Sequence, residues 1–336
     1  MYDILRQDPE IWDIFQCKEE YTSPIRDKYD RFPYYLSSNR NIFQPVVSEY
    51  LSNAGYRPEY PDGQPFAVSL THDIDNVYCS LPYKGYHFVK SFFNKDIPHC
   101  IDTALSMCSR KIPLCNFQEI MAIEEEYGAT SSFNFMALAP GDQDYSYDIR
   151  DLERELGLIS DAGWEVALHG GHKAYCDYDQ LVTEKARLEK VLGHRVAGYR
   201  NHFLRFRVPD TWQNLAKAGF LYDNTFGYAD CLGFRNGMCH PFRPYDLNLG
   251  TEIDIVEIPL AIMDVTFEVY MRLDPTRAWE MTRRLIDTVE RYNGVLGILW
   301  HNNCMKGDKL MLYKKILAYC SEKGAFMNGG KDLVIV

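Results

Sequence analysis

Several features typical of other protein classes are missing from this sequence. The ten cysteines include no C-x-x-C pair, which argues against a zinc ribbon or a thioredoxin-like redox site. A chain of 336 residues can bury a large core without disulfides, so we expect reduced thiols. No stretch approaches the run of about 18 apolar residues that spans a membrane. The N-terminus is acidic and lacks the apolar core of a signal peptide.

Positive charge is also scarce. The sequence has 36 lysines and arginines against 47 aspartates and glutamates, for a formal net charge of −11. Proteins that bind nucleic acid present basic patches, so we expect no nucleic-acid partner. A few arginines can still contact a small anionic substrate. With no export signal and no membrane span, the sequence predicts a cytoplasmic protein.

The order of polar and apolar segments predicts the domain organisation. Residues 1–60 are polar and aromatic, and the Pro/Gly break YPDGQP follows them. We therefore expect an N-terminal accessory extension over 1–60 and a main domain over 61–336. In the main domain, strands and helices alternate, which predicts parallel βα units. The expected strands are 66–71, 129–137, 164–168, 195–200, 254–260 and 294–300. The expected helices are 117–127, 148–162, 178–192, 209–218, 275–292 and 309–323.

The side-chain alternation within these strands distinguishes between two parallel folds. In FAVSLTHDID, large apolar residues occupy one face, whereas Ser69, Thr71 and Asp73 occupy the other. His72 falls on the apolar side, which predicts a structural role. WEVALH and GVLGILWH repeat the pattern. An open doubly wound sheet is apolar on both faces, whereas a barrel holds a polar site in its C-terminal mouth. The pattern therefore favours an α/β barrel.

Reactive side chains lie at the ends of the predicted inward faces. Two ionised carboxylates as close as Asp73 and Asp75 are unfavourable unless something divides their roles. One can ligate a cation while the other accepts a proton. His169 and His172 follow another strand, beside two glycines. Two imidazoles and a carboxylate suit zinc or a similar divalent ion. Each motif alone also fits a structural role, THDID as an Asx turn and LHGGH as a surface loop.

Three further residues lie near the same predicted mouth. Arg200, in GYRNH, can hold a carboxylate in its charged form by bidentate pairing. Asp264, in IPLAIMD, can orient His301, which can then protonate a leaving amine. A strand-end salt bridge and a loop aspartate are the structural alternatives.

Five segments follow one another over residues 66–301, namely THDID, LHGGH, GYR, Asp264 and LWH. This ordered set resembles the five motifs of the polysaccharide deacetylase family (NodB homology, carbohydrate esterase 4-like). The histidine pair is three residues apart here, where the family usually has four. The resemblance implies a distorted (β/α) barrel of about seven strands. The site residues implied are Asp73 as general base, Asp75, His169 and His172 as ligands of a divalent metal such as zinc, Arg200 positioning the base, and His301 as general acid beside Asp264.

The segment 223–245 is long, with glycines, arginines and aromatic residues, and such loops are usually functional. We expect it to line the substrate groove, with Arg235 and Arg243 contacting an anionic group and Trp300 as a further substrate contact. The predicted function is removal of an N-acetyl group from a carbohydrate, in particular an intracellular glycan precursor on a nucleotide or lipid carrier, used for cell-surface polysaccharide. The alternatives are an amidohydrolase for a small non-sugar amide and a metal-free glycan-binding pseudoenzyme.

Overall fold

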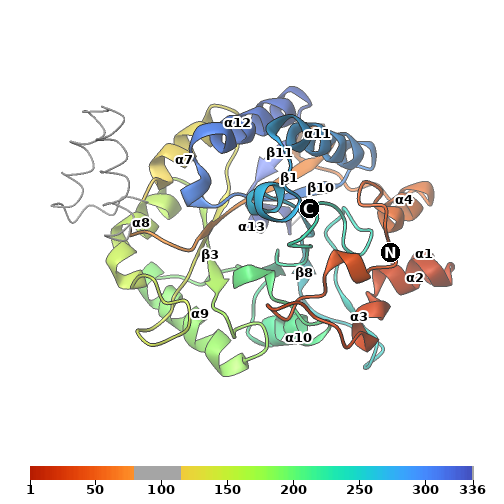
Figure 1. Cartoon of the computed structure of the whole chain (residues 1–336), viewed down its shortest axis with the longest axis horizontal. Helices are drawn as coiled ribbons and strands as arrows, with labels where there is room; N and C mark the ends of the chain where they lie inside the picture. The colour runs from red at the N-terminus through yellow and green to blue at the C-terminus, as the bar shows by residue number, and fades with distance from the viewer. Residues whose placement is uncertain (79–114, 335–336) are drawn as a thin grey trace.

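The computed structural model describes residues 1–78 and 115–334 (Figure 1). The strands of the main sheet in these ranges are β1 (Ala67–Ile74), β2 (Ser132–Phe135), β3 (Glu165–Gly170), β4 (Gly198–Asn201), β5 (Tyr222–Asp223), β8 (Val256–Glu257), β9 (Leu260–Met263), β10 (Val295–Leu299) and β11 (Phe326–Asn328). Their order is β8-β5-β4-β3-β2-β1-β10-β9, with β11 on β1. Every pairing in this sheet is parallel. A separate antiparallel pair consists of β6 (Tyr245–Asp246) and β7 (Thr251–Glu252).

The two edge strands of the sheet are neighbours in the sequence. Ile258 and Pro259 separate β8 from β9. At one end of this segment Val256 pairs with Tyr222 of β5, and at the other end Leu260 pairs with Gly297 of β10. One short piece of chain therefore joins both edges and curls the sheet into a distorted barrel. The predicted (β/α) barrel is confirmed, with more strands than the expected seven or so.

All six expected helices are present, and Figure 1 shows them around the sheet. They are α7 (Phe117–Glu125), α8 (Glu153–Asp161), α9 (Tyr178–Leu192), α10 (Asp210–Lys217), α11 (Pro275–Arg291) and α12 (Gly307–Glu322). Val68 and Leu70 of β1 share a buried cluster with Leu285 of α11 and Ile316 of α12. The apolar alternation in β1 thus faces outward to the helices, as the barrel prediction requires.

Local signals account for where α9 begins and ends. The side chain of Asp177 caps the first turn by accepting a hydrogen bond from the backbone N–H of Gln180. Gly193 ends the helix with φ 82°, a left-handed conformation that glycine adopts without steric cost. The helix lies between β3 and β4 in the sequence and connects these two parallel strands.

A short C-terminal helix, α13 (Gly330–Leu333), closes the N-terminal end of the barrel. The backbone N–H of Gly330 donates to Ser132 Oγ at 2.9 Å, and that of Lys331 donates to Glu165 Oε2 at 3.0 Å. Ser132 and Glu165 are the first residues of β2 and β3. The reactive residues lie at the opposite, C-terminal end of the barrel, on the last residues of strands or in the loops that follow them.

The N-terminal helices gather at one edge of the ring of helices in Figure 1. They are α1 (Tyr2–Leu5), α2 (Pro9–Phe15), α3 (Lys18–Thr22) and α4 (Val46–Asn53). Leu5, Phe15 and Val47 are buried in the same cluster as Phe226 and Phe242 of the main domain. The N-terminal segment thus shares its core with the barrel, and the division at residue 60 stays a prediction.

Two other expectations concern the chain as a whole. Seven cysteines lie in the described ranges, all of them free thiols, whereas Cys79, Cys100 and Cys108 lie outside the described residues. None of the helices in the described part of the chain combines the length and apolar character needed to cross a bilayer.

Candidate metal centre and active site

Three potential metal ligands meet at the C-terminal ends of β1, β3 and β4. Asp75 follows β1, His169 lies on β3, and His202 begins the short helix η4 (His202–Leu204) directly after β4. One donor atom from each lies within 4.8 Å of the other two. Asp75 Oδ1 is 3.1 Å from His169 Nε2 and 3.7 Å from His202 Nε2. One carboxylate and two imidazoles form a donor set that suits a catalytic zinc or a similar divalent ion.

Hydrogen bonds orient both imidazoles toward Asp75. His169 donates from Nδ1 to the backbone carbonyl of Arg200 at 3.1 Å. His202 donates from Nδ1 to Asp144 Oδ2 at 3.2 Å. In each ring the other nitrogen, Nε2, is left to face Asp75. Ligating histidines in metalloproteins are held in this way by a carbonyl or carboxylate acceptor, so the residues present fit a divalent ion.

The charges around the group favour a cation. Burial raises the pKa of Asp75, but the hydrogen bond from His169 and the charges of His202 and His301 lower it more, so the net pKa lies well below its ordinary value. Burial lowers the pKa of His169, yet Asp73 and Asp75 outweigh burial and raise it overall. Asp75 is therefore ionised, as a metal ligand must be, and the buried imidazole is stabilised by negative charge around it.

Asp73 lies beside this group without belonging to it. Its Oδ2 is 3.7 Å from His169 Nε2, and its Oδ1 accepts a hydrogen bond of 2.8 Å from Asn134 Nδ2. Arg200 Nε lies 3.9 Å from the same Oδ1, and Arg200 Nη2 donates to Thr71 Oγ1 at 2.8 Å. The structure therefore brings Asp73 and Arg200 together as expected and adds Asn134, which the sequence motifs did not single out.

His301 reaches the group from the other side of β1. Its Nδ1 donates to Asp264 Oδ1 at 2.7 Å, and its Nε2 lies 3.8 Å from Asp75 Oδ2. Burial lowers the pKa of His301, but the Asp264 carboxylate more than offsets this, and the pKa rises to about 10. The imidazole is therefore protonated at neutral pH and can donate a proton.

The expectation for His172 needs correction. The structure places His202, and not His172, in the group with Asp75 and His169. His172 Nδ1 lies 3.2 Å from Asp144 Oδ2, the same oxygen that accepts from His202. Its backbone carbonyl accepts a hydrogen bond from Arg205. His172 thus lies one layer outside the candidate ligands. The signal for His202 was its position two residues after Arg200, at the end of the same strand.

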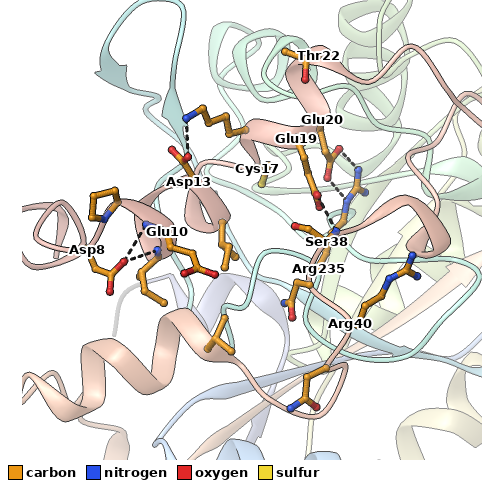
Figure 2. Close-up of a pocket in the computed structure, with 17 residues that line it drawn as sticks. Asp8, Glu10, Asp13, Cys17, Glu19, Glu20, Thr22, Ser38, Arg40 and Arg235 are labelled. Atoms are coloured by element: carbon orange, nitrogen blue, oxygen red, sulfur yellow. Dashed lines mark hydrogen bonds and ion pairs between the residues drawn. The ribbon is translucent and has the colours of Figure 1, made fainter.

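Two predicted substrate contacts are buried. The side chain of Arg235 has a relative exposure of 1%, and its guanidinium forms an ion pair with Glu20 of α3, at 2.8 Å from Nε and 2.5 Å from Nη2 (Figure 2). The side chain of Trp300 is fully buried and packs on Tyr313 of α12. Burial and these partners therefore argue against both assignments, because neither side chain is exposed at the Asp75 group.

Arg243 differs from Arg235 in its exposure. Its side chain is 43% exposed and pairs with Asp254 and Glu252. Its backbone carbonyl accepts a hydrogen bond from Tyr2 Oη at 2.9 Å, so the residue lies against the N-terminal helices. A role of Arg243 in substrate binding stays a prediction.

A pocket of about 880 Å³ lies among α2, α3 and residues 38–41 (Figure 2). Of the residues predicted for the site, Arg235 is the one found in its wall. The pocket contains none of the candidate ligands, nor Asp73 or His301. We therefore place the candidate active site at the Asp75 group and not at this pocket.

No family model matches the sequence, and no curated protein matches it. Two solved structures resemble the fold. One is a candidate polysaccharide deacetylase from Mycobacterium smegmatis, with 20% identity, a TM-score of 0.56, and coverage of 83% of this chain and 92% of that chain. The other is Puue allantoinase, with 13% identity, a TM-score of 0.58, and coverage of 89% of this chain and 97% of that chain. The chain thus has the fold of the polysaccharide deacetylases, which the sequence motifs indicated.

Proposed function

We propose that this protein is a metal-dependent hydrolase that removes an N-acetyl group from a carbohydrate. The observation that supports it best is the Asp75–His169–His202 group with a carboxylate and a protonated imidazole beside it. Asp73 lies 3.7 Å from His169, and His301 lies 3.8 Å from Asp75. Amide hydrolysis needs a polarised carbonyl, a base for the attacking water and an acid for the leaving amine, and this arrangement supplies residues for each.

The candidate ligands are Asp75, His169 and His202. When bound, a divalent ion acts as a Lewis acid that polarises a carbonyl oxygen and acidifies water. Nitrogen donors together with one carboxylate favour zinc among the common divalent ions. We therefore propose zinc.

The proton transfers are assigned to two residues of the chain. Asp73 accepts the proton of the attacking water, while Asn134 and Arg200 hold the carboxylate in place. His301 donates its Nε2 proton to the departing amine nitrogen. Asp264 fixes the ring orientation and stabilises the charged imidazole. A positioned acid or base of this kind typically contributes about 10²–10⁴-fold in rate.

The fold likeness to the Mycobacterium smegmatis protein supports a carbohydrate substrate. Within that class we propose an N-acetylated sugar on a nucleotide or lipid carrier inside the cell. The burial of Arg235 removes one of the two arginines expected to contact the carrier phosphate, which leaves Arg243 as the candidate. The test is acetate release from free N-acetylhexosamines, from their diphosphate-linked forms and from polymeric chitin or peptidoglycan. Preference for the polymer would reject the carrier-linked substrate and leave the deacetylase proposal intact.

A second candidate function is hydrolysis of a small non-sugar amide. The likeness to Puue allantoinase, which extends over 97% of that chain, favours it. The same base, acid and ligands would serve a ring amide. Turnover of allantoin and related cyclic amides, with no acetate release from any sugar, would select this function.

Metal content separates both hydrolases from a metal-free glycan-binding protein. We expect about one divalent ion per chain in the purified protein, and loss of turnover after chelation that added zinc restores. A protein that binds glycans but takes up no metal under any condition would reject the hydrolase proposal.

A further inference from the structure

The turn that carries His202 has an unusual backbone. Phe203 and Leu204 follow it with φ values of 60° and 54°. This left-handed region is unfavourable for a non-glycine residue and persists where surrounding contacts fix it. His202 begins this turn, so the backbone of the turn sets the direction of the His202 ring. That direction matters because Nε2 has to face Asp75.

Contacts from the N-terminal segment fix the turn. The ring of Tyr29 stacks on Phe203 with centroids 4.5 Å apart and an interplanar angle of 16°. Phe203 stacks in turn on His202, at 3.8 Å and 26°. Three rings thus form one stack from the N-terminal segment to the candidate ligand. Hydrogen bonds run beside it, from Arg31 Nη1 to the Phe203 carbonyl at 2.9 Å and from Arg205 Nε to the Tyr29 carbonyl at 2.8 Å.

Residues 27–31 are themselves held in one conformation. Asp27 Oδ1 accepts hydrogen bonds from the backbone N–H groups of Tyr29 and Arg31 at 2.9 and 3.0 Å. Asp27 Oδ2 accepts from Arg31 Nε at 2.8 Å. The carboxylate of Asp30 accepts two bonds from Arg207, at 2.9 and 2.8 Å. The segment is therefore attached at residue 203, within the strained turn, and again at residue 207, just after the turn.

We propose that residues 27–31 are a positioning element for the metal centre, acting through Phe203 on His202. Tyr29 supplies the aromatic support, and Arg31 supplies the hydrogen bond to the turn. This inference rests on the proposed metal-dependent function. It assigns a role to the N-terminal segment, which contributes no donor atom to the Asp75 group. Partners that orient a ligand without touching the metal typically change metal affinity by about 10–100-fold when lost.

The test measures zinc affinity of the full chain by competition with a chromogenic chelator. We expect Tyr29→Ala to bind zinc at least about ten-fold more weakly than the unmodified chain, and Tyr29→Phe, which keeps the ring, to bind as the unmodified chain does. Tyr34→Ala is the matched control. Tyr34 lies three residues after the 27–31 segment, and its ring contacts Tyr228, with centroids 5.4 Å apart. The absorption spectrum of the cobalt-substituted protein should change with Tyr29→Ala and not with Tyr34→Ala.

A double-mutant comparison tests whether the effect passes through His202. In a His202→Ala background, Tyr29→Ala should cause no further loss of zinc affinity. An equal loss in both backgrounds, or unchanged affinity of Tyr29→Ala alone, would overturn the inference while leaving the metal centre in place. An unmodified chain that binds no zinc would reject the metal centre itself. If Tyr29→Ala does not fold, Tyr29→Leu keeps the apolar bulk without the flat ring and is expected to show the same loss.

Discussion

His301 is bound twice by the carboxylate of Asp264. The imidazole donates from Nδ1 to Oδ1 at 2.7 Å, and the backbone N–H of His301 donates to Oδ2 at 3.0 Å. Asp264 is fully buried, and although burial raises its pKa, the charge and hydrogen bonds of His301 lower it below the ordinary value. The pair is therefore an ionised carboxylate and an imidazolium, with Nε2–H free to point at a substrate.

The general-acid role of His301 predicts a dependence on the leaving group. His301→Ala should slow hydrolysis of an N-acetyl sugar by roughly 10²–10⁴-fold. Hydrolysis of 4-nitrophenyl acetate should fall much less, because 4-nitrophenolate leaves without a proton. Steady-state kinetics on the two substrates provide the comparison. Equal losses on both would show that His301 does not act as the acid.

Asp73 is predicted to be a base and not a ligand. Asp73→Asn should retain the metal, because Asp73 is not in the group of candidate ligands, and should lower turnover by roughly 10²–10⁴-fold. Metal content and turnover are measured on the same preparation. Asp161→Asn, at the exposed end of α8, is the control for loss of a carboxylate. A variant that loses its metal would place Asp73 among the ligands.

The two histidines on either side of Asp144 should differ in their effect on metal binding. His202→Ala removes a candidate ligand and should weaken zinc binding by more than about 100-fold while leaving a residual affinity that can be measured. His172→Ala removes a residue one layer further out, so its effect should stay within the range of about 10–100-fold typical of outer residues. Calorimetric titration of zinc into both variants measures the difference. The reverse ranking would restore His172 as the third ligand.

The ion pair between Glu20 and Arg235 should stabilise the fold and leave the chemistry unaffected. Removing one partner of a buried pair leaves an uncompensated charge and costs about 3–5 kcal/mol, so Arg235→Ala should lower the free energy of unfolding by that order. Arg243→Ala should change it by about 0–1 kcal/mol, because that pair is exposed. Urea unfolding of both variants measures this. A raised KM of folded Arg235→Ala with unchanged stability would contradict the structural role.

His240 predicts a pH dependence of stability away from the active site. Burial lowers its pKa from 6.5 to about 4, with Ser48 Oγ at 2.9 Å from Nδ1 and the Tyr292 carbonyl at 2.8 Å from Nε2. Because the folded protein favours the neutral imidazole, this stability is present above pH 6.5 and is lost as the pH falls toward 4. The loss amounts to about 3 kcal/mol.

The measurement for His240 is urea unfolding between pH 7 and pH 4. Because other groups titrate in the same range, the unmodified chain is compared with a variant that lacks the imidazole. The unmodified chain should lose more stability over this range than His240→Gln, which has no imidazole to protonate. Identical pH dependence of the two proteins would show that His240 does not contribute.

The alternation of residues within strands predicted much of the site. Asp73, His169 and His301 follow the inward parity of β1, β3 and β10, and the structure brings them together at the barrel mouth. His72 has the opposite parity, and its Nε2 lies 2.8 Å from Glu124 of α7, buried on the outer face. The strands β5 and β11 were not predicted, because two or three residues are too short for a periodic pattern.

The sequence by itself thus determined the barrel, its helices and the parity of the reactive residues, since these follow from a local repeat of two or of 3.6 residues. The tertiary structure decided the rest. His202 joins Asp75 because the turn after β4 is fixed by Tyr29 and Arg31, about 170 residues earlier in the chain. Arg235 is withdrawn from solvent by Glu20, 215 residues away. Loop direction and charge pairing depend on contacts between distant segments, and no local period in the sequence encodes them.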